Sequence, residues 1–410
     1  MHAPSNSLPE KELVLVGGGY PHLQILRKWR TNALPGVRLT VISPDRELVY
    51  SGMLPGVLAG LYSLTEATID LQQLCAACDA RLIAAAAVGL DAAGRIINLN
   101  DRPPIPFDVV SFAVGSIPRT AGGESCPGMI SLKPLKDFPK RWEEAVRRLC
   151  SKSTTNVPGT SMAPLKVVVV GGGAAGCEIT LALERWMNRE AVALEIRLVE
   201  SGREILSGST ARTVQRMRRE LVRRGVQVET SLAVLGVRPD RGAGPREAER
   251  VRLEVNQGDA WSADLVVWAT GAAPPPWLSR LDLPLDDHGF LLVEPTLQTV
   301  SGRPVFAAGD VASLRGVPLP KAGVHAVRQG DLLWGNLCRF FRGQPLQSYR
   351  ARGFLSLISL GNGRALGDFH GWSFEGGWVW RWKDRIDRAF IARFSGPGPG
   401  ASGSRADPPW

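Results

Sequence analysis

Apolar residues of this chain gather in short continuous runs, which are separated by longer stretches with helical spacing. Four of these runs have the length of buried strands: Leu13–Val16, Val37–Ile42, Lys166–Val170 and Leu194–Val199. Strands of a parallel sheet are covered on both faces, so their sequences are continuous apolar runs in which apolar and polar residues do not alternate. The repeated order of strand, helix and strand predicts an α/β protein with mainly parallel sheets.

The segment Lys166–Glu178 carries the strongest motif of the chain. Gly171, Gly173 and Gly176 have the G-x-G-x-x-G spacing of a dinucleotide-binding turn. The first glycine permits the tight turn, the second lets a pyrophosphate approach the backbone, and the third brings helix and strand close together. The next strand ends at Glu200, where an acid can accept hydrogen bonds from an adenosine ribose. We therefore predict dinucleotide binding in this unit.

A second unit of the same kind lies near the N-terminus, where Gly17-Gly18-Gly19 follows the first strand. It departs from the fingerprint twice. His22 takes the place of the third glycine, and the second strand continues into Ser43 and Asp45 instead of ending in an acid. Two alternatives are open for His22, contact with a phosphate or packing against the sheet. We expect Asp45, or more weakly Ser43, to reach a ribose.

Three later segments are predicted to be buried strands that lead into a glycine: Asp108–Gly115, Asp264–Gly271 and Pro304–Asp310. In the third segment the glycine, Gly309, is followed by an acid, Asp310. The pair Thr270-Gly271 echoes Val114-Gly115, which indicates that two halves of the chain repeat one architecture. Asp310 can accept a hydrogen bond from a sugar or ribityl hydroxyl, or it can cap a helix.

Two further segments are expected near the carboxyl ends of these strands, where a ligand would bind. The loop Tyr50–Gly56, which contains Gly52, is placed where a ligand ring would lie at the edge of an open parallel sheet. The helix predicted over Lys321–Phe341 would point its positive N-terminal end at bound negative charge.

Polar and glycine-rich stretches divide the chain into domains. Residues 8–125 and 285–345 are predicted to form one Rossmann-like dinucleotide-binding domain, with a second such domain, residues 165–275, inserted in it. A C-terminal segment with an amphipathic helix follows at 346–394, and residues 395–410 read as a disordered tail.

Composition limits the function classes. The chain has 410 residues, of which 44% are hydrophobic, and this is enough for two or three domains with full cores. No apolar run approaches the roughly 20 residues of a membrane span, so a cytoplasmic protein is expected. The net charge of +10 favours an anionic partner, but no zinc-ligand spacing or nucleic-acid motif is present.

Cys75 and Cys78 have C-x-x-C spacing. Two alternatives are open for them: a redox pair, or simply two small residues on one face of a helix.

The segment Gly377–Phe394 is rich in aromatic and basic residues. Its apolar side chains stand four apart, on one face of a predicted helix: Trp378, Trp382, Ile386, Phe390 and Phe394. This composition is typical of a helix that lies in a membrane interface. The alternative is a helix that docks over the first domain or in a homodimer contact.

The order of these glycines and acids resembles flavoproteins with two dinucleotide-binding domains, the pyridine nucleotide-disulfide oxidoreductase superfamily, over about Leu8–Phe394. Within it, the chain is similar to type II NADH dehydrogenases and to the flavoprotein module fused ahead of selenide, water dikinase. The closer match is carried by Ser43-Pro-Asp-Arg, Tyr50-Ser-Gly-Met-Leu-Pro-Gly, Pro320-Lys-Ala-Gly-Val and Trp382-Lys-Asp-Arg-Ile-Asp.

The resemblance implies FAD in the first domain, completed by Gly309-Asp310, and NAD(P)H in the inserted domain. It implies that the nucleotide is held by Gly171, Gly173, Gly176, Glu178 and Glu200. Glu200 would repel a 2′-phosphate and so favours NADH over NADPH, although Arg203 nearby acts in the opposite direction.

Electrons are then expected to pass from NADH through FAD to a quinone. We predict that Lys321 and the amide groups at its helix start, beginning at Ala322, stabilise the anionic reduced flavin. Type II dehydrogenases carry an Ala-Gln element near the quinone, whereas Ala322-Gly323-Val324-His325 stands here, so the acceptor is open. One alternative is sulfide or selenide oxidation through Cys126, Cys177 or Cys338, and another is a redox-sensing flavoprotein without turnover.

Overall fold

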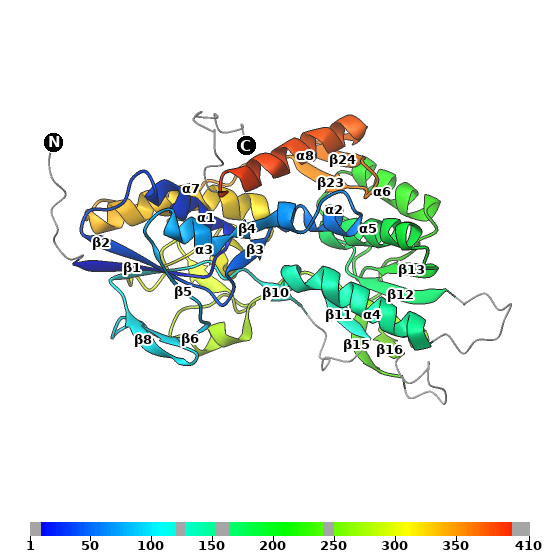
Figure 1. The fold of residues 1–410 in the computed structure, drawn as a ribbon, viewed down its shortest axis with the longest axis horizontal. Coiled ribbons are helices and arrows are strands. Elements are labelled where there is room, and N and C mark those ends of the chain that lie inside the picture. The colour runs from blue at the N-terminus through cyan, green and yellow to red at the C-terminus, as the bar shows by residue number, and fades with distance from the viewer. Residues whose placement is uncertain (1–9, 120–127, 153–163, 241–249, 396–410) are drawn as a thin grey trace.

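The computed structural model describes residues 10–119, 128–152, 164–240 and 250–395. Figure 1 shows two lobes side by side, each built on a sheet, with the last helix lying across the top of both. The predicted α/β class with two Rossmann-like domains is confirmed. Two polar stretches, 153–163 and 241–249, and the predicted tail from residue 396 lie outside the described residues.

The first sheet has five parallel strands in the order β21-β9-β1-β2-β5. They are β1 (Lys11–Val16), β2 (Val37–Ile42), β5 (Arg81–Ile83), β9 (Val109–Phe112) and β21 (Val305–Ala307). Leu13 in the central strand pairs with Leu39 on one side and Val109 on the other. Because β21 pairs with β9, the chain returns to the first sheet after it has built the second domain.

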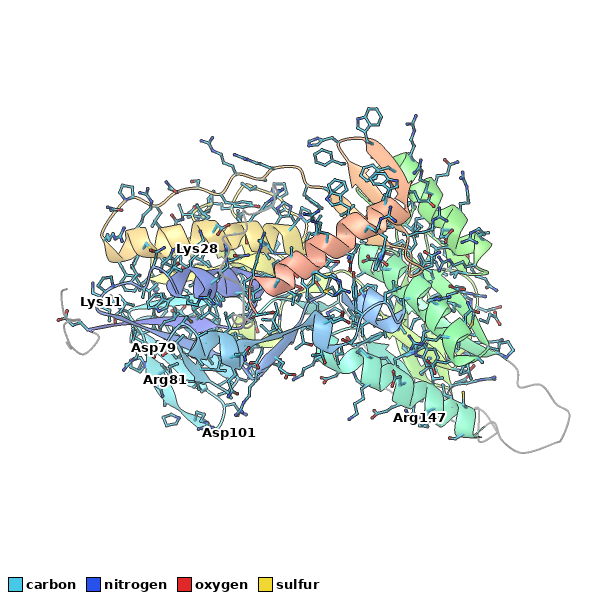
Figure 2. The ribbon with its side chains drawn as sticks, turned by 45° about the horizontal axis from the view of Figure 1, so that its top comes forward. Lys11, Lys28, Asp79, Arg81, Asp101 and Arg147 are labelled. Atoms are coloured by element: carbon cyan, nitrogen blue, oxygen red, sulfur yellow. The ribbon has the colours of Figure 1, made fainter. Side chains whose placement is uncertain are left out.

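Helices α1 (Tyr20–Trp29) and α7 (Gly323–Phe341) pack against each other on one face of this sheet. Lys28, labelled in Figure 2 beside α7, forms an ion pair of 2.9 Å with Asp331. The rings of Trp29 and Trp334 meet edge to face at 5.8 Å. The two glycine-led helices that begin and end the first domain are thus held together.

The second sheet has the same plan, in the order β11-β18-β12-β13-β14. Its first strand and its first helix come from residues 128–152, so the inserted domain includes this segment in addition to the predicted residues 165–275. Its parallel strands are β11 (Met129–Ser131), β12 (Leu165–Val170), β13 (Leu194–Val199), β14 (Gln227–Glu229) and β18 (Leu265–Trp268). Its helices are α4 (Phe138–Lys152), α5 (Ala174–Glu190) and α6 (Ala211–Arg223). A small antiparallel sheet joins β15 (Val234–Pro239), β16 (Val251–Val255) and β17 (Trp261–Ala263).

The two domains share a core. Helix α2 (Leu54–Leu58) begins within the predicted Tyr50–Gly56 loop of the first domain and packs on α5 of the second. Its neighbour Met53 is buried in one apolar cluster with Trp142 and Trp186 of the second domain. Apolar burial contributes about 25 cal/mol per Å², so a shared cluster of this kind resists rotation of one domain against the other.

Short elements complete the first domain: β3 (Glu47–Val49), β4 (Thr68–Asp70), α3 (Leu71–Ala76), β6 (Ala87–Asp91), β7 (Ile96–Leu99), β8 (Arg102–Pro106), β20 (Leu291–Val293) and β22 (Ala312–Leu314). Short 3₁₀ turns are η1 (Thr65–Ala67), η2 (Leu135–Asp137), η4 (Pro276–Arg280) and η5 (Gly309–Val311). The segment Arg81–Leu90 is divided between two sheets. β5 joins the main sheet, and β6 starts a separate antiparallel meander. Helix α3 begins at Leu71, because Asp70 ends β4 and caps the helix by accepting from the Gln73 N–H.

A two-stranded link, β10 (Ile117–Pro118) with β19 (Ala272–Ala273), joins the exits of the two domains. The C-terminal segment forms an antiparallel sheet of β23 (Ser356–Ser359), β24 (Ala365–Phe369) and β25 (Trp372–Gly376), followed by α8 (Gly377–Ala392). Both views show α8 lying over the two lobes. In the described part of the chain, no helix combines the length and the apolar character that crossing a bilayer requires.

The predicted single apolar face of α8 was wrong in part. Phe390 and Phe394 are 3% exposed, and Phe390 stacks on Tyr50 of the first domain with ring centroids 4.6 Å apart. Trp378 and Trp382, in contrast, are 52% and 43% exposed. The stripe therefore divides along its length, so that one end covers the first domain and the other faces outward.

Candidate functional site

Equivalent glycine turns stand at the carboxyl ends of the two central strands. Gly17 has φ +91°, and a Cβ built on it would lie 2.6 Å from the Ala113 carbonyl oxygen. Gly171 has φ +111°, and its Cβ would lie 2.5 Å from the carbonyl oxygen of Ala269. A side chain fits at neither position, because the turn presses against the end of the neighbouring strand.

The third fingerprint position differs between the two turns. A Cβ on Gly176 would lie 1.8 Å from the Gly171 carbonyl oxygen, so only glycine fits. In the first domain His22 is fully buried, with Nδ1 2.6 Å from the Gly17 carbonyl oxygen and Nε2 2.9 Å from Ser111 Oγ. Burial lowers the pKa of His22 to about 4, so the ring is neutral. Of the two alternatives for His22, this geometry favours packing.

The second fingerprint glycine marks open space in the inserted domain. A Cβ on Gly173 would meet nothing within 4 Å, and Gly173 precedes the first turn of α5 without a side-chain cap. The N–H groups at this helix start are therefore available to an anion. In the first domain Gly19 is more crowded, since its Cβ would lie 2.4 Å from the Ala113 carbonyl oxygen. Open space there begins instead at Gly115.

The acids that follow the second strands are both engaged. Glu200 accepts hydrogen bonds from the N–H groups of Gly172, at 2.6 Å, and Gly202, at 2.7 Å, which fixes its carboxylate at the rim of the turn. Asp45 forms an ion pair with Lys136 from the inserted domain. Ser43 Oγ donates to the Asp45 backbone oxygen at 2.8 Å. Ser43 therefore shapes the turn that carries Asp45.

Asp310 lies at the same edge of the first sheet. Ser116 Oγ donates to its carboxylate at 3.1 Å, and Lys133 of the inserted domain lies 3.9 Å from it. The preceding Gly309 has φ +77° and donates its N–H to Gln329 Oε1 at 2.6 Å. The second alternative for Asp310, a side-chain helix cap, is not seen: η5 begins at Gly309 without one.

Lys321 lies just before α7, whose N-cap residue is Ala322. Its ammonium group donates to the Ala312 carbonyl oxygen at 2.5 Å and stands 3.9 Å from the centre of the Phe290 ring. Burial lowers the pKa of Lys321, and the negative charge of Asp310 opposes this effect. The start of α7 has no side-chain cap, so its first N–H groups are also available to an anion.

Glu178 on α5 faces the C-terminal segment. Its carboxylate accepts from the Ser359 N–H at 2.7 Å, and burial raises the pKa of Glu178 to about 7 against the opposing charge of Lys383. Lys383 on α8 donates to the Gly52 carbonyl oxygen at 2.7 Å and to Asp387 at 2.6 Å. We name Glu178, Lys383, Asp387 and Tyr50 the α8 charge cluster; Lys383 and Asp387 are buried, and Glu178 and Tyr50 are half-buried. Tyr50 belongs to it because it bonds Asp387 and lowers the pKa of that carboxyl, which burial raises.

Other residues predicted in the site have structural partners. Thr270 Oγ1 donates to the Arg119 carbonyl oxygen at 2.5 Å, and Gly271 accepts from the Arg119 N–H at 2.8 Å, so this pair secures the link between the domains. Gly18 lies against the side chains of Leu48 and Leu71.

Sequence reasoning missed Lys133, Lys136, Lys383 and Asp387. The spacing of Lys383 and Asp387, one helical turn apart in the Trp382–Asp387 motif, could have indicated a buried pair. Nothing in the sequence around Lys133 marks it, because its partners lie in the other domain.

The buried cysteines Cys75, Cys78 and Cys177 are poor nucleophiles. Cys75 and Cys78 are buried, and burial raises the pKa of these thiols to about 12 and about 11. Cys177 is also buried and its pKa is raised, while its thiol donates to the Gly172 carbonyl oxygen. Cys126 lies outside the described residues. Among the described residues there is no group of three or more histidines, cysteines and acids that could hold a metal ion.

Comparison with known proteins gives a consistent result. A family model for pyridine nucleotide-disulphide oxidoreductases matches residues 11–330. The chain is 26% identical to the demethylphylloquinone reductase NdbB of Synechocystis, over 68% of this chain and 66% of that protein. It is also 26% identical to a type II NADH:quinone oxidoreductase of Haemophilus influenzae, over 64% and 62%. These matches thus span somewhat less than two thirds of either relative.

Two solved structures share the fold over nearly the full chain. The NDH2 of Plasmodium falciparum in complex with NADH has a TM-score of 0.77 at 15% identity, covering 93% of this chain and 97% of that one. The sulfide:quinone oxidoreductase of Aquifex aeolicus has a TM-score of 0.76 at 15% identity, covering 94% and 91%. At this identity the likeness concerns the fold alone.

Proposed function

Because the chain belongs to the pyridine nucleotide-disulphide oxidoreductase family, we propose that it binds FAD in the first domain and NADH in the second, and reduces a quinone. The observation that carries this proposal is the pair of equivalent turns at Gly17 and Gly171, each closed by the neighbouring strand and each at the carboxyl edge of a parallel sheet. The curated relatives named above are quinone reductases, which supports the choice of acceptor.

The residues at the edge of the first sheet fit FAD. The positive-φ turn at Gly17 and the open space at Gly115 form the cradle, and Asp310 offers a carboxylate to a sugar or ribityl hydroxyl. The uncapped start of α7 at Ala322 adds backbone N–H groups. When bound, FAD supplies the chemistry of accepting a hydride and releasing electrons. The tasks of the protein are then to hold, orient and shield the reacting groups.

The inserted domain fits a nicotinamide nucleotide. Gly173 leaves room for a pyrophosphate, and Glu200 is fixed at the rim where an adenosine ribose would bind. A carboxylate at this position favours a free 2′-hydroxyl over a 2′-phosphate, so NADH is the preferred donor. Arg203 is exposed close by and reduces that preference without reversing it.

Lys321 keeps the role predicted for it, stabilisation of negative charge near the start of α7. It lies beside Asp310 with a cation–π contact to Phe290, so its position is fixed before any ligand binds. A Lys321→Met variant is expected to slow flavin reduction and lower the flavin midpoint potential. If both quantities stay unchanged, the role is excluded.

Quinone reduction consumes protons, and the α8 charge cluster can hold one. With a pKa of about 7, Glu178 carries a proton for much of the time at neutral pH. It lies at the contact between the inserted domain and α8, next to Lys383. We assign to it the transfer of a proton toward the acceptor.

A lipid surface is the proposed location of the acceptor. Exposed rings gather on the β24–β25 hairpin and the start of α8, with Trp372 72% and Phe369 41% exposed in addition to Trp378 and Trp382. Arg381 and Arg385 are exposed on the same helix. Aromatic rings beside basic side chains suit an anionic bilayer surface. We name Phe369, Trp372, Trp378 and Trp382 the outer aromatic patch and propose that it binds the membrane peripherally.

Sulfide oxidation is the rival, and the fold shared with the Aquifex aeolicus enzyme is its specific support. The raised pKa of the buried Cys177 thiol disfavours it. The deciding experiment is anaerobic addition of NADH, NADPH and sulfide, each separately, to the purified protein while the flavin absorbance is followed. Rapid bleaching by NADH and recovery with a soluble quinone support the proposal. Bleaching by sulfide alone, or by no donor, overturns it.

A further inference from the structure

We propose that the inserted domain completes the FAD site of the first domain through one turn, Leu132–Asp137, with Lys133 as a cofactor-positioning residue. This inference rests on the proposed function, since it assumes FAD at the first sheet edge. It adds residues from another domain to that site. It also makes FAD retention dependent on how the two domains are docked.

Lys133 reaches out of its own domain. It follows β11, the edge strand of the second sheet, yet its ammonium group donates to the Ser116 carbonyl oxygen at 2.7 Å and to Ser116 Oγ at 2.9 Å. Ser116 is 7% exposed and itself donates to Asp310. An ammonium group has three N–H donors, and two are used on Ser116. The contact that remains is the 3.9 Å approach to Asp310.

The same turn sends a second lysine to the second acid of the cofactor edge. Lys136 forms an ion pair with Asp45, the acid that follows β2. Asp45 and Asp310 stand at the carboxyl ends of two different strands of the first sheet. One short turn of the inserted domain therefore places a cation on each of them.

Charge balance explains why these cations are needed. The pyrophosphate of FAD brings two negative charges to an edge that already carries the carboxylates of Asp45 and Asp310. Glycine turns and helix starts supply only partial positive charge. Lys133 is half-buried, where the screening of charges by water is weaker, so its effect on a bound anion is larger than that of a surface lysine. It also fixes Ser116 directly after Gly115, at the open part of the cradle.

The test compares FAD binding to the full-length protein and its variants Lys133→Met, Lys133→Arg, Lys136→Met and Lys140→Met. Lys140 is the matched control, because it stands on the following helix with 80% of its side chain exposed, and among the described residues its ion pair is with Glu144 of that same helix, at 3.8 Å. The Kd for FAD is measured by quenching of flavin fluorescence on the deflavinated protein, at low and high salt. The melting temperature of each deflavinated variant is recorded alongside.

We expect Lys133→Met to raise the Kd for FAD at least tenfold and to weaken its dependence on salt. Lys133→Arg should recover most of the affinity, Lys136→Met should lose about threefold, and Lys140→Met should match the wild type. An unchanged Kd in Lys133→Met overturns the inference. It is also overturned if the Kd rises only in variants whose deflavinated form melts at a lower temperature than the wild type. If the wild type itself binds no FAD, the proposed function fails. If the wild type binds FAD and Lys133→Met binds it equally well, the proposed function stands and this inference alone fails.

Discussion

The ammonium group of Lys383 lies 2.6 Å from the carboxylate of Asp387, and both side chains are 5% exposed. The pair stands on α8, and Lys383 also donates to the Gly52 carbonyl oxygen in the first domain. A buried ion pair contributes little net stability, but removal of one partner leaves a buried charge without compensation. The pair thus makes the docking of α8 depend on both residues together.

Lys383→Met should therefore lower the free energy of unfolding by about 3 kcal/mol, measured by urea denaturation. The double variant Lys383→Met with Asp387→Leu should regain most of this loss, because neither member of the pair is left as a charge without its partner. Arg385→Met is the control: Arg385 is exposed on the same helix, so its loss should change stability by less than about 1 kcal/mol. Equal losses in the single and double variants would contradict this account.

The two glycines of the inserted turn should respond differently to alanine. Gly173 has φ −69° and open space around its Cβ position, so Gly173→Ala should fold with a melting temperature close to the wild type. The added methyl group occupies the space assigned to the pyrophosphate, so the Kd for NADH should rise at least tenfold. Gly176→Ala, whose Cβ would lie 1.8 Å from the Gly171 carbonyl oxygen, should lose stability as well as binding. Fluorescence titration with NADH and thermal melting separate the two. Unchanged NADH binding in Gly173→Ala would refute the assigned site.

Much of this architecture could be predicted from the sequence, because local patterns cause it. The apolar runs from Leu13 and Lys166 and the glycines that follow them define both strand–turn–helix units without any knowledge of the partner domain. The division of Arg81–Leu90 could not be predicted, since an apolar run does not say which sheet a short strand joins. The contacts of Lys133 could not be predicted for a related reason. Its partners Ser116 and Asp310 come together only after the chain has left the first domain and returned.

The outer aromatic patch should govern membrane binding. Trp372 and Trp378 are 72% and 52% exposed, so the double change to serine removes apolar contact area without opening the core. Binding to vesicles that contain anionic phospholipid should fall at least fivefold in co-sedimentation, while turnover with a water-soluble quinone stays the same. Leu235→Ser is the control, because Leu235 is 56% exposed on β15, away from α8. Loss of binding in the control, or none in the double variant, would remove the patch from membrane contact.

Turnover should depend on the proton held by Glu178. With a pKa of about 7, this carboxyl loses its proton as pH rises through neutrality, so quinone reduction should fall above about pH 7. Glu178→Gln should lower turnover about a hundredfold and abolish that decline, since general acids contribute factors of this order. Steady-state rates with a soluble quinone between pH 5.5 and 9 test this, with NADH-dependent flavin bleaching as the control step. A variant that keeps both the rate and the decline would show that the proton comes from elsewhere.

His22 and Glu178 should tilt the pH dependence of stability in opposite directions. The pKa of His22 is lowered to about 4, so below pH 6.5 the unfolded chain binds a proton that the folded chain does not, and stability rises with pH between about 4 and 6.5. The pKa of Glu178 is raised to about 7, so between its ordinary value of 4.5 and pH 7 the folded chain holds the extra proton, and stability falls as pH rises. Each shift corresponds to about 3 kcal/mol, so in the shared window from pH 4.5 to 6.5 the two nearly offset each other.

Glu178→Gln should therefore reveal a steeper rise of unfolding free energy with pH than the wild type shows, and His22→Asn should reveal a fall. Urea denaturation at steps of half a pH unit from pH 4.5 to 7 measures both slopes. Subtracting the wild-type curve from each variant curve removes the contribution of the other carboxyl groups to the pH dependence. His22→Asn keeps a side chain that can donate to the Gly17 carbonyl oxygen, so its loss of stability should stay small enough for measurement. Parallel curves for all three proteins would mean that neither group is perturbed by folding.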